Sequence, residues 1–74
     1  MRTLREIAHE IRREWPKVNY AAEPYLAAMA TLEKITDQYI CDDGKSIVLY
    51  FLSNATSWRG ESARRIKAEL KAML

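Results

Sequence analysis

The stretch SIVLYFLS at residues 46–53 decides the fold, because it contains six consecutive apolar residues, Ile47–Leu52. A buried strand and a buried helix both fit such a run, and its β-branched and aromatic residues favour a strand. Two observations favour a helix instead. A lone strand would find no partner in this chain for its backbone groups, and Asn54 stands where a helix C-terminus uses asparagine. We therefore predict a third helix that is apolar nearly all round, central and the most buried element.

Residues 3–15 carry the clearest helical pattern in the chain. Thr3 can cap the first turn, and Glu6 three residues later completes a capping box. Pro16 disfavours helical backbone at Trp15 and ends the helix there. At about 100° per residue, one narrow face gathers the apolar side chains Leu4, Ile7, Ala8, Ile11 and Trp15.

A second helix is predicted over residues 23–39, with Pro24 in its first turn, where the missing N–H would have had no partner. Leu26 lies off the apolar face of this helix, so we expect it to be exposed or to touch a partner. A loop over residues 41–44 follows, in which Asp42 or Asp43 can cap the third helix. The apolar face of the second helix consists of Tyr25, Ala28, Met29, Leu32, Ile35 and Tyr39.

A fourth helix is predicted over residues 58–74, with Ser57 as its cap. Arg65 lies four residues from both Glu61 and Glu69 and can pair with either. The apolar face consists of Ala63, Ile66, Leu70, Met73 and Leu74, and Arg64, Lys67 and Lys71 line one flank. The fold class predicted from these segments is all-α, a compact bundle of about four short helices in one domain over residues 1–74.

The small size of the chain limits how it can be stabilised. With 74 residues, it buries only about 60% of the surface of the unfolded chain. Cys41 is the single cysteine and His9 the single histidine, which excludes an internal disulfide and argues against a metal site. Self-association as a homo-oligomer is therefore predicted. The chain starts amphipathically and has no apolar run of membrane-span length, so we expect a cytoplasmic protein.

The charges are segregated along the chain, although the net charge is only +2. Residues 1–17 and 57–74 are net basic, whereas residues 18–56 are net acidic. Such a pattern indicates complementary charges, either inside the fold or between copies of the chain. It is weaker than the basic footprint of a dedicated nucleic-acid-binding protein.

Motifs for catalysis or cofactor binding are missing from the sequence. Gly44-Lys45-Ser46 resembles the end of a phosphate-binding loop, but Tyr39 stands where that loop needs a glycine. No motif places a nucleophile beside His9. We therefore predict that the protein is not an enzyme and uses no cofactor.

The basic residues near the C-terminus are open to two interpretations. They can follow phosphates along a nucleic acid, with Trp58 adding base stacking, or they can cover the edge of the apolar face with their stems. No known DNA-binding motif supports the first interpretation. The candidate interaction surface consists of Arg59, Arg64, Lys67, Lys71, Arg5, Arg12 and Leu26.

Residues 46–74, with LREIAHEIRREW at residues 4–15, resemble a group of short uncharacterised proteins encoded by actinobacteriophages, including mycobacteriophages. The likeness rests on the YFLSNA run at residues 50–55 and on WRGE at residues 58–61. It implies a small accessory phage protein in the host bacterial cytoplasm, and it carries over no catalytic residues. We predict a non-enzymatic function through protein–protein interaction that modulates the bacterial host. The alternative is a small DNA-binding regulator that uses the basic flank of the last helix.

Overall fold

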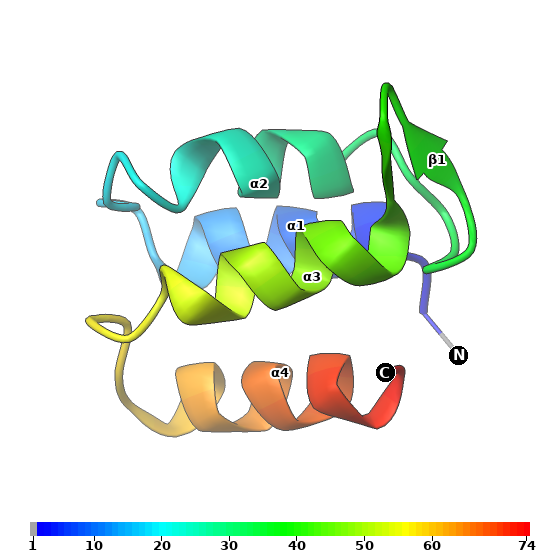
Figure 1. Ribbon diagram of the computed structural model, residues 1–74. Helices are drawn as coiled ribbons and strands as arrows, with labels where there is room; N and C mark the ends of the chain where they lie inside the picture. The colour runs from blue at the N-terminus through cyan, green and yellow to red at the C-terminus, as the bar shows by residue number, and fades with distance from the viewer. Residues whose placement is uncertain (1) are drawn as a thin grey trace.

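The computed structural model describes residues 2–74, which form four helices and one very short hairpin (Figure 1). The chain is mainly helical, as predicted, but it is not purely all-α. In chain order the elements are α1 (Leu4–Glu14), α2 (Glu23–Met29), β1 (Gln38–Tyr39), β2 (Asp42–Asp43), α3 (Gly44–Ser53) and α4 (Glu61–Ala72). Over these residues, no helix combines the length and the apolar character needed to cross a bilayer.

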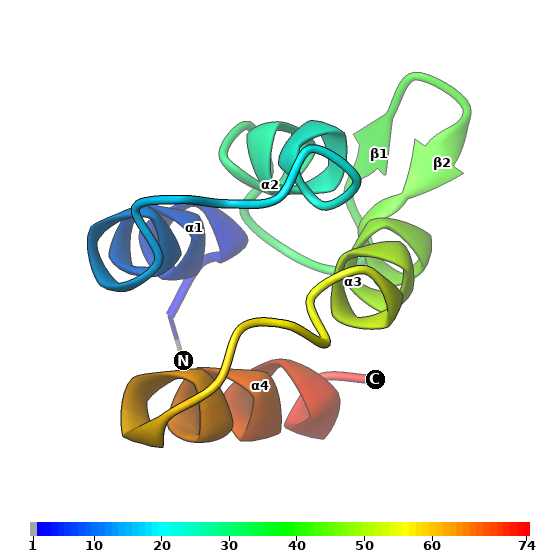
Figure 2. The ribbon, with the colours of Figure 1, turned by 90° about the vertical axis from the view of Figure 1, so that its left-hand side faces the viewer.

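The four helices occupy the corners of a bundle around one shared core, as the end-on view shows (Figure 2). α2 packs against both α1 and α3, and α4 packs against α1. The buried apolar residues of the core are Leu4, Ile7, Ala8, Ile11, Ala22, Leu26, Ala28, Met29, Leu32, Ile47, Val48, Phe51, Ala55, Trp58, Ala63, Ile66 and Leu70.

The α3 helix confirms that the apolar run of residues 47–52 is helical. It is not the centre of the fold, however, and that prediction is wrong. Ile47, Val48 and Phe51 are buried, whereas Leu49 is 44% exposed and Tyr50 is 46% exposed. Three short helices are too few to surround a fourth. Even a helix that is apolar on all sides must therefore expose one of its sides to solvent.

The α1 helix forms as predicted. The Thr3 hydroxyl accepts a hydrogen bond from the Glu6 amide at 3.1 Å, and the Glu6 carboxylate accepts from the Thr3 amide at 2.8 Å, which completes the capping box. The next free amides of the first turn, on Leu4 and Arg5, donate to the carbonyls of Glu33 and Leu32, both at 2.9 Å. The start of α1 is therefore fixed against the chain that follows α2.

The α2 helix ends at Met29, and the prediction of a helix to residue 39 is wrong. The Thr31 hydroxyl donates to the Ala28 carbonyl at 2.8 Å. The Asp37 carboxylate accepts from the amides of Glu33 and Lys34, both at 3.0 Å. Short polar side chains of this kind compete with helical hydrogen bonds and stabilise turns instead. The residues between α2 and α3 therefore leave the helical path.

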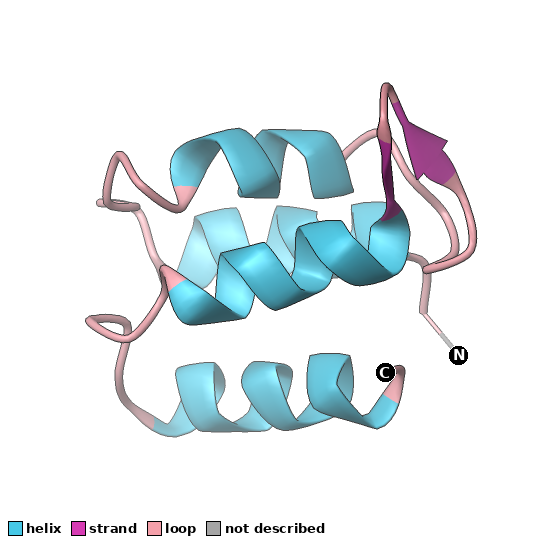
Figure 3. Cartoon of the chain, viewed as in Figure 1, coloured by secondary structure: helices cyan, strands magenta, loops and turns pink. Residues whose placement is uncertain are grey.

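The hairpin after this turn pairs β1 with β2, with Gln38 opposite Asp43 and Tyr39 opposite Asp42 (Figure 3). Ile40 in its two-residue loop has a φ of 56°, in the left-handed region that β-branched residues rarely adopt. The hairpin leads directly into α3, so of the loop predicted over residues 41–44 only Cys41 lies in a loop, while Asp42 and Asp43 form β2 and Gly44 begins α3.

Both ends of α3 are capped as predicted. The Asp43 carboxylate accepts from the Ser46 amide at 2.8 Å, and the Asn54 side-chain amide donates to the Tyr50 carbonyl at 2.8 Å. The Gly44 amide donates to the Asp37 carbonyl at 2.7 Å. A Cβ atom on Gly44 would lie 2.8 Å from the Ile35 Cα and the Lys34 carbonyl oxygen. Only glycine allows this close approach of the two segments.

The α4 helix begins at Glu61, so the predicted start at Trp58 with Ser57 as the cap is wrong. The residue before the helix is Gly60, with a φ of 114° that side-chain-bearing residues rarely adopt. The Ser57 hydroxyl instead accepts a hydrogen bond from the Asn19 side-chain amide at 3.2 Å, and the same amide donates to the Asn54 carbonyl at 2.9 Å. Ser57 thus joins the two loops at one end of the bundle.

We expect Gly44→Ala to destabilise the protein by about 1–3 kcal/mol, because the new methyl group would overlap backbone atoms that cannot rotate away. Urea unfolding followed by tryptophan fluorescence measures the effect. Lys45→Ala is the control, with a change within about 0.5 kcal/mol, since its side chain is exposed. A Gly44→Ala variant more stable than the parent chain, as helix propensity alone would give, contradicts the close packing at this position.

Candidate interaction surface

Three cations near the N-terminus lie beside carboxylates of the same chain. Arg2 contacts Glu10 at 2.6 Å, Arg12 contacts Glu23 at 2.6 Å, and Arg5 lies 3.7 Å from Glu33. Arg5 and Arg12, both predicted to belong to an interaction surface, thus face the acidic middle of the chain. A good part of the charge segregation seen in the sequence is therefore complementary within the fold.

The most enclosed of these carboxylates is Glu10, whose side chain is only 14% exposed. It accepts hydrogen bonds from both Arg65 and Arg2, at 2.6 Å each, and these bonds lower its pKa to about 2. Arg2 also bonds Glu69, so the pairs connect α1 to α4. The prediction that Arg65 pairs with Glu61 or Glu69 of its own helix is wrong, because its guanidinium group bonds Glu10 of α1 instead.

Lys67 is tied to the loop before α4 and is not free to follow a phosphate backbone. Its ammonium group donates to the carbonyls of Ala55 and Trp58, both at 2.7 Å, and lies 5.8 Å from the centre of the Trp58 ring. Burial lowers the pKa of Lys67, and the nearby charges of Lys71 and Arg59 lower it further. A partly buried ammonium that satisfies two carbonyls holds this loop in one conformation.

Trp58 is also part of the core rather than the surface. It is only 4% exposed and stacks on Trp15, with ring centres 5.4 Å apart and ring planes 7° apart. Trp15 in turn meets Phe51 edge-on at 6.4 Å. The ring of Trp58 is therefore not available to stack on a nucleic-acid base, which removes one part of the DNA-binding interpretation.

Leu26 is completely buried, so the expectation that it is exposed is wrong. The inward face of α2 follows Ala22, Leu26 and Met29, which are spaced by four and three residues. This face starts at Ala22, before Pro24, and a small alanine in a connecting segment gives little sign of being in the core. The prediction that the helix extends to residue 39 also contributed, because the apolar residues of the longer segment define a face that does not include Leu26.

The basic residues left on the surface of α4 and its preceding loop are Arg59, Arg64 and Lys71. All three are exposed, and none has a carboxylate within ion-pair distance among residues 2–74. Arg59 and Arg64 line a shallow hollow of about 250 Å³ together with Trp58, Gly60, Ala63 and Lys67. Of the predicted flank, Arg64 and Lys71 thus remain on the surface without a partner among residues 2–74, and Arg59 in the preceding loop joins them.

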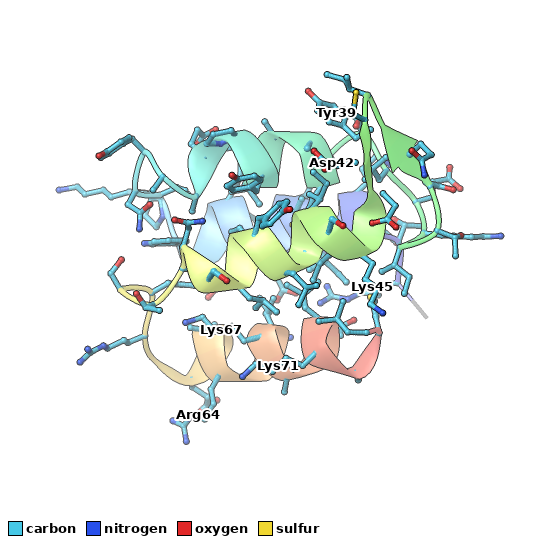
Figure 4. All side chains as sticks on the ribbon, viewed as in Figure 1. Tyr39, Asp42, Lys45, Arg64, Lys67 and Lys71 are labelled. Atoms are coloured by element: carbon cyan, nitrogen blue, oxygen red, sulfur yellow. The ribbon has the colours of Figure 1, made fainter. Side chains whose placement is uncertain are left out.

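Three residues of α3 extend the surface formed by these cations. The candidate interaction surface predicted from the sequence did not include them. Lys45, Leu49 and Leu52 are spaced by four and three residues and so share one side of the helix. Lys45 reaches from α3 toward α4, where Lys67 and Lys71 lie on the near side and Arg64 projects below (Figure 4). We call Lys45, Leu49, Leu52, Arg64 and Lys71 the α3–α4 face. The unbroken apolar run hid this side of α3, because it made every side chain an equal candidate for the core.

A larger hollow of about 500 Å³ lies at the other end of α4, between Arg2, Thr3, Ile35 and Met73. Neither hollow contains a histidine or cysteine in its lining. Within residues 2–74, no three of the histidine, cysteine, aspartate and glutamate side chains lie close enough together to hold a metal ion. The chemical groups concentrated on the surface are therefore cations and leucines.

Comparison with known proteins adds no assignment: no protein-family model, curated protein or solved structure matches the chain. Function is therefore inferred from the surfaces of the molecule itself. Among these, the α3–α4 face combines the exposed Leu49 and the half-buried Leu52 with cations that make no ion pair among residues 2–74.

We expect Lys67→Met to lower the free energy of unfolding by about 1–3 kcal/mol, because two carbonyls lose their charged donor. Lys71→Met, one turn further along the same helix, is the matched control and changes stability by about 0.5 kcal/mol or less. Urea unfolding curves of the two variants make the comparison. Equal effects would show that Lys67 is an ordinary surface lysine.

Proposed function

We propose that this protein acts without catalysis, by binding another protein through the α3–α4 face. The observation that carries the proposal is the exposure of Leu49, 44% of whose surface is open to solvent on the same side of α3 as Lys45. Exposed apolar side chains beside polar ones are typical of protein-binding surfaces. The ion pairs of the fold support the same view, since those among Arg2, Arg12, Arg65 and their carboxylates involve no cation of this face.

The resemblance to actinobacteriophage accessory proteins supports a setting for this interaction. On this proposal the protein works in the cytoplasm of a bacterial host, where it binds a host or phage protein and modulates the host. A second copy of the chain is one possible partner, in keeping with the small core expected of a chain of 74 residues.

DNA binding is the second candidate function, favoured by the three unpaired cations Arg59, Arg64 and Lys71. With three phosphate contacts, a plot of the logarithm of the binding constant against the logarithm of the salt concentration would have a slope of about −3. Against this candidate stand the two residues that are used internally, Trp58 and Lys67. The remaining cations are few for a nucleic-acid-binding surface.

Affinity capture from bacterial host lysate, with and without nuclease, distinguishes the two functions. We expect the parent chain to retain a protein partner after nuclease treatment. The double variant Arg64→Glu with Lys71→Glu should lose that partner, because it reverses the charge of the α3–α4 face. The control is Arg13→Glu with Lys17→Glu, which changes the net charge equally at exposed positions of the opposite end of the chain.

Two results contradict the proposal. Loss of the captured partner on nuclease treatment assigns the surface to nucleic acid. Equal capture by the parent chain and the α3–α4 double variant means that this face is not the binding surface.

A further inference from the structure

We infer that the partner segment recognised by the α3–α4 face is an acidic amphipathic helix. This inference rests on the proposed function and adds the chemistry of the partner. It follows from three properties of the face: the spacing of its side chains, the sign of its charges and the exposure of Leu49 on the same side of α3 as Lys45.

The spacing of the side chains forms two parallel rows. Lys45, Leu49 and Leu52 follow one side of α3, and Arg64 and Lys71 lie two turns apart on α4. The two helices run in opposite directions, so that Lys45 lies near the same end of the bundle as Lys71 (Figures 1 and 4). A partner helix laid along these rows would meet cations from both helices and the exposed Leu49 of α3. In such helix-in-groove binding, the bound helix makes its contacts through side chains at every third and fourth position.

The charge of the face is positive, and none of its cations makes an ion pair within residues 2–74. Lys71 and Arg59 lie close enough to Lys67 to lower its pKa, which indicates a concentration of positive charge on this side of α4. Asp43, the acidic residue nearest Lys45 in sequence, is already bonded to the Ser46 amide. Glu61 makes no ion pair with any residue in the described range 2–74. Complementary charge must therefore come from the partner.

The leucines favour an acidic helix over a nucleic acid as the partner of this face. A phosphate backbone would satisfy the cations but leave Leu49 without an apolar contact. A helix with glutamates flanking a row of leucines satisfies both, since removing the leucine side chains from water is favourable. The neighbouring aromatic Tyr50 does not extend the site, because it packs against Tyr25 of α2 at 5.4 Å. α4 has 12 residues, and a partner helix of about 12–14 residues would match its length.

Fluorescence anisotropy with designed peptides tests the inference. The probe is a labelled helical peptide of about 14 residues, with leucines at every third and fourth position and glutamates on both flanks. One comparison peptide replaces its glutamates with lysines, and another replaces its leucines with serines. The protein is the full chain, and circular dichroism confirms that each variant is folded.

We expect the acidic leucine peptide to bind, and both comparison peptides to bind at least tenfold more weakly. Leu49→Ser and Lys71→Glu should each weaken binding about tenfold, the effect of losing one buried leucine or one ion pair. Arg13→Glu, on the exposed surface of α1, should leave the affinity unchanged.

Four results overturn the inference. They are absence of binding at millimolar peptide, equal binding of the serine peptide, equal effects of Arg13→Glu and Lys71→Glu, and tighter binding of duplex DNA or of anionic phospholipid vesicles than of the acidic peptide. Failure here, with a nuclease-resistant partner still captured from lysate, would reject only the acidic helix and leave the proposed function standing.

Discussion

The ammonium group of Lys67 organises the half of the bundle on which the surface depends. By bonding the carbonyls of Ala55 and Trp58, it closes the loop between α3 and α4 against its own helix. Closing the loop in this way brings Trp58 onto Trp15 of α1. One side chain therefore connects the end of α3, the start of α4 and the aromatic packing against α1. A neutral side chain of similar length could fill the space, but it could not satisfy the two carbonyls.

This use of Lys67 divides the basic residues of α4 by role. Arg65 turns to α1 and pairs with Glu10, and Lys67 turns to the loop, so both contribute to the fold. Arg64 and Lys71 lack such partners within the described chain and are left on the surface. Together with the leucines of α3, they make a face that is both cationic and apolar, which is the combination that fits an acidic helix better than a phosphate backbone.

The sequence predicts best where a hydrogen bond is made between near neighbours. Thr3 with Glu6, Asp43 with Ser46 and Asn54 with Tyr50 are all such local bonds, and each marks a helix end correctly. The helical state of residues 47–52 was also predictable, because a strand had no partner.

What the sequence misses is decided by groups far apart in the chain. Lys67 bonds carbonyls in a loop whose path no residue pattern specifies, and Arg65 prefers Glu10, which is 55 residues away. α2 ends early because Asp37 captures amides of a turn that helical periodicity does not reveal. The outward side of α3 stayed hidden for a related reason: which side of an apolar helix faces water depends on where the other helices lie.

Nuclear magnetic resonance of the lysine side chains tests the central role of Lys67 most directly. The chain has five lysines, Lys17, Lys34, Lys45, Lys67 and Lys71, whose Nζ signals can be followed separately. The account predicts that Lys67 titrates at a lower pH than a lysine in an unfolded peptide, and that its ammonium protons exchange with water far more slowly than those of Lys71. Exchange of the Lys67 protons as fast as those of Lys71, with titration at the unfolded value, would contradict it.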